Sequence, residues 1–105
     1  MSIYCTYLTT YYGNKLPPFY IGSSSVEKIK NGYHGSVSSK KYKETWDKEL
    51  KENPHFFKTI IITKHNTSKD ARSKELRFHR HLRVVQSSMY VNQALAKPNG
   101  FHGSD

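Results

Sequence analysis

The chain has 105 residues, of which 35% are hydrophobic, and a mean hydropathy of −0.78. This length predicts a single domain, residues 1–105, with a modest core. Uninterrupted apolar runs such as Ile60 to Ile62 are too short to span a membrane. A formal charge of +9, from 17 Lys and Arg against 8 Asp and Glu, favours nucleic acid as the partner over a merely soluble basic surface.

The first part of the chain predicts two paired strands. Residues Ser2 to Thr10 are rich in Tyr, Ile and Thr, as strands are, and Phe19 to Ile21 forms a second short run after the Pro17-Pro18 loop. The two runs are expected to form an antiparallel hairpin with a long loop. Val26 to Lys30 can then make one helical turn.

A helix is predicted next, over about Lys40 to Lys51, with Ser38 or Ser39 as its cap. Its apolar side chains fall four residues apart and form one stripe, which consists of Tyr42, Trp46 and Leu50. Asn53-Pro54 ends the helix, and Phe56 to Thr63 predicts the strongest strand of the chain.

A second long helix is predicted over about Lys69 to Gln86, after a cap within Asn66 to Ser68. Its inward stripe is expected to consist of Ala71, Glu75, Phe78, Leu82 and Val85. A short extended piece, Met89 to Val91, follows. The order β-β-α-β-α predicts an α+β fold, a small three-stranded antiparallel sheet flanked by helices.

The cysteine count and the N-terminus bear on the compartment. Cys5 is the only cysteine, which excludes an intrachain disulfide and a Cys-rich zinc site. The first residues, MSIYCTY, lack the basic-then-apolar pattern of a signal peptide. We therefore expect an intracellular protein.

Glu75 stands out because it lies in the inward stripe of its own helix. A carboxylate that faces inward is costly unless a cation or a metal meets it. Glu75 either pairs with Arg72 or His79 at the edge of the stripe, or holds Mg²⁺ together with water and a substrate phosphate. His79 and His81 are two residues apart, which is poor zinc geometry on a helix, and both are expected at the surface.

His34 lies between Gly32 and Gly35, where glycine lets the backbone approach a ligand closely. The alternative is an exposed loop histidine. Tyr7 and Tyr20 are expected on neighbouring strands, and either tyrosine can equally be a core residue.

The segment Tyr20-Ile21-Gly22, preceded by Cys5-Thr6-Tyr7, resembles the two motifs of the GIY-YIG nucleases. Gly32 to Ser36 and Asn99 to Gly103 resemble a loop and a tail of phage and virus homing-endonuclease-like members, so the likeness covers nearly all of the chain. The first motif has Cys and Thr in place of Gly and Ile. Tyr4, in Ser2-Ile3-Tyr4, is the alternative first tyrosine.

The resemblance implies a metal-dependent endonuclease that hydrolyses DNA with Mg²⁺ or Mn²⁺, held by Glu75. Tyr7 or Tyr20 would orient or deprotonate the attacking water, and His34 would accept its proton. The family has an arginine on the helix after the second motif, but no arginine precedes Arg72 here. Lys30 or Lys40 would then stabilise the phosphate charge, and Asn92 would position the phosphate or the helix of Glu75.

Two other functions stay open. The first is a non-catalytic, basic nucleic-acid-binding module on a degenerate nuclease fold, with its aromatic side chains stacked on bases. The second is a protein-binding adaptor, which the charge disfavours. A catalytic module of this size would take its sequence specificity from its loops, a separate partner chain or a homodimer.

Overall fold

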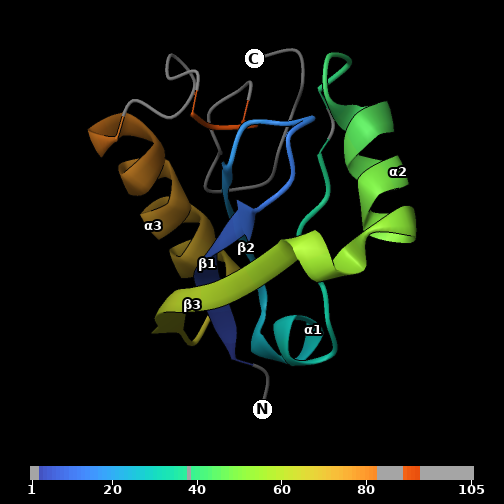
Figure 1. Ribbon diagram of the computed structural model, residues 1–105. Coiled ribbons are helices and arrows are strands. Elements are labelled where there is room, and N and C mark those ends of the chain that lie inside the picture. The colour runs from blue at the N-terminus through green and yellow to red at the C-terminus, as the bar shows by residue number, and fades with distance from the viewer. Residues whose placement is uncertain (1–2, 38, 83–88, 93–105) are drawn as a thin grey trace.

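The computed structural model describes residues 3–37, 39–82 and 89–92. Its centre is a three-stranded antiparallel sheet in the order β2-β1-β3. The strands are β1 (Tyr4–Tyr11), β2 (Phe19–Ser25) and β3 (Phe57–His65). In Figure 1 the sheet stands between helix α3 on one side and helix α2 on the other, which confirms the predicted α+β fold.

The helices are α1 (Val26–Lys30), α2 (Lys43–Glu52) and α3 (Ser68–His81), with a short 3₁₀ turn, Pro54–Phe56, before β3. The start of α2 is three residues later than predicted, because residues 40–42 form a turn in which the Ser39 carbonyl already accepts from the Lys43 N–H at 2.9 Å. No helix in the described ranges is long and apolar enough to cross a membrane.

The register of the sheet places the two tyrosine motifs side by side. Strand β1 pairs with β2 so that Tyr7 lies opposite Gly22 and Thr9 lies opposite Tyr20. On its other side β1 pairs with β3, with a register shift between Thr6 and Tyr7. Tyr7 therefore faces the glycine of the second motif directly across two hydrogen-bonded strands.

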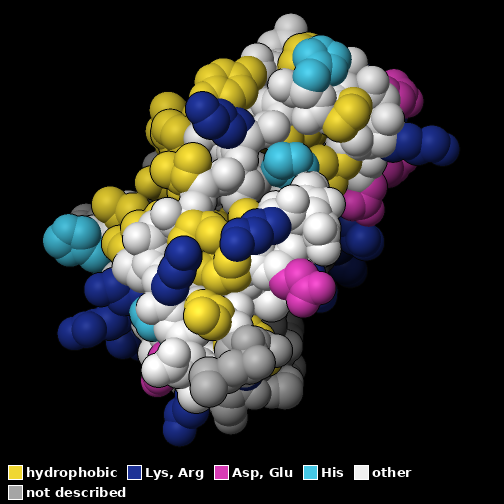
Figure 2. All heavy atoms as spheres, turned by 90° about the horizontal axis from the view of Figure 1, so that it is seen from below, with side chains coloured by type: hydrophobic (Ala, Val, Ile, Leu, Met, Phe, Trp, Pro, Cys, Tyr) yellow, Lys and Arg dark blue, Asp and Glu magenta, His cyan; other side chains and the backbone are white. Residues whose placement is uncertain are grey.

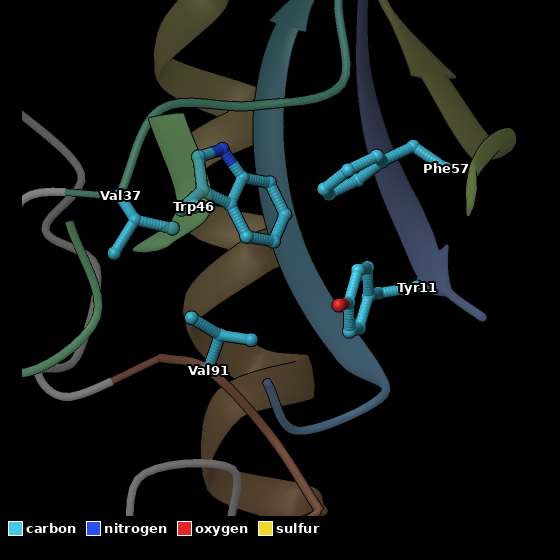
Figure 3. Close-up of a cluster of buried hydrophobic side chains, with 5 residues drawn as sticks. All are labelled: Tyr11, Val37, Trp46, Phe57 and Val91. Atoms are coloured by element: carbon cyan, nitrogen blue, oxygen red, sulfur yellow. The ribbon is translucent and has the colours of Figure 1, made fainter. Parts of the chain in front are cut away.

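An aromatic cluster joins α2 to the sheet (Figure 3). It consists of Tyr11, Val37, Trp46, Phe57 and Val91. Trp46 is fully buried, its ring lies 5.0 Å from that of Phe57, and its Nε1 donates to the Gly35 carbonyl at 3.1 Å. The predicted stripe of α2 is confirmed, because Tyr42 and Leu50 pack on the same cluster.

A buried carboxylate also fastens α2 to β1. The Tyr11 hydroxyl donates to Glu49 Oε1 at 2.5 Å, and the Asn53 amide donates to Glu49 Oε2 at 2.8 Å. These two hydrogen bonds lower the pKa of the Glu49 carboxyl, so it stays ionised although its side chain is enclosed.

The inward face of α3 differs from the predicted stripe. Its buried residues are Ala71, Glu75 and His79, spaced by four, whereas Leu82 is 42% exposed and Phe78 is half-buried. The prediction that His79 lies at the surface is wrong, and His81 is exposed as expected. The small Ala71 lets the helix approach β1, where the Thr6 hydroxyl donates to the Ala71 carbonyl at 2.9 Å. Val85 and Gln86 lie outside the described residues.

The outer edge of β2 is paired by the segment 89–92. The Phe19 N–H donates to the Met89 carbonyl at 3.0 Å, and the Val91 N–H donates to the Phe19 carbonyl at 2.7 Å. The predicted extended piece Met89 to Val91 therefore runs parallel to β2 at this point. Asn92 follows directly, beside Ile21.

Candidate active site

Three tyrosines from different elements meet at one place. The rings of Tyr7 and Tyr20 lie 6.2 Å apart, and the ring of Tyr33, from the loop after α1, stands edge-on to Tyr7 at 6.3 Å. A Cβ atom at Gly22 would lie 2.5 Å from the Tyr7 hydroxyl oxygen. Position 22 therefore requires glycine, because the Tyr7 side chain fills the space that a Cβ atom would need.

The loop that follows α1 closes over the same rings. Gly35 has φ +110°, and a Cβ atom there would lie 2.6 Å from the Tyr20 ring. The Tyr20 hydroxyl donates to the Ser36 carbonyl at 3.0 Å, and the Tyr33 hydroxyl lies 3.0 Å from Ser36 Oγ. The glycines of this loop were expected to admit a ligand, but Gly35 brings the backbone against the tyrosines.

Burial sets the protonation state of the two motif tyrosines. Burial first, and then the charges of nearby groups that include Glu75, raises the pKa of Tyr7 well above its ordinary value. Burial and the Glu75 charge likewise raise the pKa of Tyr20, against a hydrogen bond from Tyr7 that lowers it. Both hydroxyls are therefore protonated near neutral pH and act as hydrogen-bond donors.

Glu75 projects from α3 into this region. Only 9% of its side chain is exposed. Burial raises the pKa of the Glu75 carboxyl to about 7, although a hydrogen bond from Ser23 and the charge of Arg72 both lower it. Its Oε2 lies 3.4 Å from Nε2 of His79, and the charge of Arg72 lowers its pKa. Both residues that were expected to pair with Glu75 therefore interact with it.

Asn92 holds the backbone at the centre of the second motif. Its Oδ1 accepts from the Ile21 N–H at 3.0 Å, and its Nδ2 donates to the Ile21 carbonyl at 2.9 Å. Because these groups face the outer edge of β2, the side-chain amide continues the pairing that Met89 to Val91 begins. By holding the Ile21 backbone, Asn92 fixes the strand between Tyr20 and Gly22.

His34 is held by threonines of two strands, Thr59 of β3 and Thr9 of β1. Its Nδ1 lies 2.7 Å from Thr59 Oγ1, its carbonyl accepts from the Thr9 hydroxyl at 2.7 Å, and its ring lies 5.8 Å from that of Phe57. Partial burial lowers the pKa of His34, so the ring is neutral near pH 7. The next residue, Gly35, is the one that lies against the tyrosine rings.

The two predicted lysines lie at the surface. Lys30 is the exposed last residue of α1, and Lys40 is exposed in the turn before α2. Within the described part of the chain, the cations that meet the site are Lys28, whose Nζ lies 5.6 Å from the centre of the Tyr33 ring, and Arg72.

Sequence reasoning named His79 as a possible partner of Glu75 but expected it at the surface, and it missed Tyr33 as a neighbour of the site. His79 had a usable signal, because Ala71, Glu75 and His79 are spaced by four and lie one above another on a helix. Tyr33 had none, because its position follows from the path of the loop after α1, where Gly32 and Gly35 have positive φ. Lys28 lies on α1 and meets Tyr33 only because of that path.

The surface around α1 mixes cationic and apolar side chains. Figure 2 views this end of the molecule and shows Lys and Arg beside hydrophobic side chains, with acidic side chains close to them. Such a surface suits a polyanion that also offers flat, apolar bases.

The donor set at Glu75 limits which metal the site could take. The described residues contain no group of three or more His, Cys, Asp or Glu side chains placed to hold a metal. A single carboxylate suits Mg²⁺ or Mn²⁺, which keep several waters and accept phosphate oxygens. Burial raises the pKa of the Glu75 carboxyl to about 7, so Ser23 and Arg72 offset the cost of its charge only in part.

Comparisons of the chain with models of protein families, with curated proteins and with solved structures found no match.

Proposed function

We propose that this chain is a metal-dependent endonuclease that hydrolyses DNA phosphodiester bonds with a site of the GIY-YIG kind. One observation carries the proposal: the Glu75 carboxyl on α3 acts on both motif tyrosines, which β1 and β2 bring together. The formal charge of +9 supports a polyanionic substrate.

In this proposal Glu75 holds Mg²⁺ or Mn²⁺. When bound, the metal supplies Lewis-acid stabilisation of the charge that develops on the phosphate. Glu75 must be ionised to bind it, and its raised pKa means that the metal competes with a proton near pH 7. Ser23 and Arg72 favour the ionised form, which is the form that a metal requires.

Tyr7 and Tyr20 act in this proposal as protonated phenols that orient the attacking water and the phosphate, since their raised pKa values disfavour the phenolate that a base would need. The Tyr20 hydroxyl would have to exchange its hydrogen bond to the Ser36 carbonyl for one to the water or the phosphate. His34 is the group assigned to accept a proton, because its neutral ring has an unprotonated nitrogen, although its lowered pKa makes it a weaker base than an ordinary histidine. Asn92 positions the strand that carries Tyr20.

The phosphate charge needs a cation in place of the missing arginine. Lys28 and Arg72 are the better placed candidates, because Lys28 lies over Tyr33 and the charge of Arg72 acts on Glu75. Lys28, Lys30 and Lys40 are all exposed, and of the three Lys28 is the one that lies over a tyrosine ring of the site. A lysine gives a point charge and lacks the planar fork of arginine.

A non-catalytic nucleic-acid-binding module is the second candidate. The observation that favours it is the enclosure of the site, since Tyr7 is 1% exposed and Glu75 is 7% exposed. In that case the basic surface and exposed aromatic side chains such as Tyr12 would bind the backbone and the bases without cleavage.

Relaxation of supercoiled plasmid by the purified protein, in Mg²⁺, Mn²⁺ or EDTA, tests the proposal. Glu75→Gln removes the charge and keeps the shape, and Glu44→Gln makes the same change at an exposed residue of α2. We expect metal-dependent nicking by the wild type and by Glu44→Gln. We expect no nicking by Glu75→Gln, with DNA binding retained in a gel shift.

Two results would overturn the proposal in different ways. Nicking at the wild-type rate by Glu75→Gln would remove Glu75 as the metal ligand. A wild-type protein that shifts DNA in a salt-sensitive manner but nicks it under no metal would establish the binding module instead.

A further inference from the structure

His79 is a buried polar residue that the proposed mechanism leaves unused. Its side chain is 0% exposed, and it lies one turn after Glu75 on the face that α3 turns to the sheet. An imidazole at such a position loses its hydration, and this loss must be offset by hydrogen bonds within the protein.

The partners of His79 fix its tautomer. Its Nε2 lies 3.1 Å from the Ile21 carbonyl oxygen, 3.4 Å from Glu75 Oε2 and, at the longer distance of 3.5 Å, from Asn92 Nδ2. The Ile21 carbonyl oxygen, which is nearest, can only accept, and Glu75 Oε2 also accepts when Glu75 is ionised, so Nε2 carries the hydrogen and donates. The Ile21 carbonyl also accepts from Asn92 Nδ2 at 2.9 Å, which fills both of its lone pairs.

This arrangement joins two elements of the site. Ile21 lies between Tyr20 and Gly22, so its carbonyl belongs to the strand that carries one motif tyrosine. Glu75 belongs to α3. A single N–H from His79 therefore faces one acceptor on the strand and one on the carboxylate.

We propose that His79 is a positioning residue, whose Nε2–H holds Glu75 Oε2 at a fixed place relative to the Tyr20 strand. This inference rests on the proposed function, because the carboxylate that His79 holds is the one assigned to the metal. Loss of a group that hydrogen-bonds a metal ligand commonly lowers metal affinity or activity by about 10–100-fold.

Two amide substitutions test the reach of this N–H. In His79→Gln the amide nitrogen comes to about the place of Nε2, and in His79→Asn it stops at about the place of Nδ1. His81→Asn makes the same change at an exposed residue of the same helix. Each protein is examined for Mn²⁺ binding without DNA, by electron paramagnetic resonance of free Mn²⁺, and for plasmid nicking over a range of Mn²⁺ concentrations.

We expect His79→Asn to lose about 10–100-fold in Mn²⁺ affinity and to need correspondingly more Mn²⁺ for nicking, while His79→Gln stays within about threefold of the wild type. All assays run below the melting midpoints of the variants. If His79→Asn does not fold, His79→Phe, which keeps a ring without a donor, takes its place.

Folded His79→Asn with wild-type Mn²⁺ affinity would overturn the inference, and so would equal losses in the Gln and Asn variants, which would make the ring's packing the cause. These results would leave the proposed function intact if the wild type nicks DNA. A wild type that neither binds Mn²⁺ nor nicks DNA would overturn the proposed function, and this inference with it.

Discussion

The contact between glycines and tyrosine rings predicts the cost of three alanine substitutions. At Gly22 a Cβ atom would lie 2.5 Å from the Tyr7 hydroxyl oxygen and 2.7 Å from its Cζ, which is closer than such atoms can approach. Tyr7 is 1% exposed and is enclosed by other rings, so it cannot swing aside freely. Overpacking of this kind costs about 1–3 kcal/mol, which we expect for Gly22→Ala.

Gly35 and Gly32 separate backbone strain from crowding. Both have positive φ, +110° and +95°, but a Cβ atom at Gly32 would have no neighbour within 4 Å, whereas one at Gly35 would lie 2.6 Å from the Tyr20 ring. Gly32→Ala should therefore cost about 1–2 kcal/mol from the left-handed backbone alone. Gly35→Ala should cost about 2–5 kcal/mol, the sum of strain and overpacking.

Urea unfolding followed by circular dichroism measures these losses, with equal m-values as the check that only stability has changed. In a thermal melt each 1 kcal/mol corresponds to about 4–8 °C for a domain of this size. The difference between the Gly35 and Gly32 variants isolates the tyrosine contact and should be about 1–3 kcal/mol. Equal losses at the two positions, or a Gly22→Ala protein as stable as the wild type, would refute the packing described for this site.

Three further predictions concern the buried polar groups. Asn92→Ala leaves the Ile21 N–H without its partner and the Ile21 carbonyl with one donor fewer, and should lower the free energy of unfolding by about 2–4 kcal/mol in urea; an unchanged midpoint would contradict this. Burial raises the pKa of Glu75 from 4.5 to about 7, so its contribution to stability is full below the unfolded value and is lost as the pH rises through 7. Relative to Glu75→Gln, the wild type should thus lose roughly 3 kcal/mol between about pH 4 and about pH 8, and a pH-independent difference would argue against burial of the charge. Tyr11→Phe removes the hydrogen bond that keeps the pKa of Glu49 low, so it should destabilise the protein more at neutral than at acidic pH in thermal melts, and equal losses would count against that bond.

The strands and helices followed from local patterns. The Tyr- and Thr-rich run of β1 and the Ile60 to Ile62 run of β3 have strong strand propensity, and the Trp46 stripe of α2 has helical spacing. These signals depend on neighbours in the sequence alone. They sufficed for the α+β class and for most boundaries.

The face of α3 could not be obtained in the same way. Hydrophobicity favoured Phe78 and Leu82 as inward residues, but the close approach of Ala71 to Thr6 turns the helix so that His79 faces the sheet. A polar side chain can be buried at low cost only where hydrogen-bond partners are in place. For His79 these belong to Ile21, which is 58 residues away in the sequence.

The site residues also differ in whether the sequence could predict their positions. The hairpin predicted Tyr7 and Tyr20 on neighbouring strands, but the register that sets Tyr7 opposite Gly22 is seen only in the structure. The bond of His34 to Thr59 and the place of Lys28 over Tyr33 depend on the loop after α1, whose course no periodic pattern encodes. The exposed Lys30 and Lys40 were chosen by spacing, and spacing does not report how a loop folds over the rings.

Plasmid nicking by the wild type and Glu75→Gln, each in Mn²⁺ and in EDTA, tests the central claim most directly. The account predicts nicked circles for the wild type in Mn²⁺ alone, and supercoiled plasmid in every other lane. Nicking that persists in EDTA, or in Glu75→Gln with Mn²⁺, would contradict a metal-dependent site built on the carboxylate that meets the paired tyrosines.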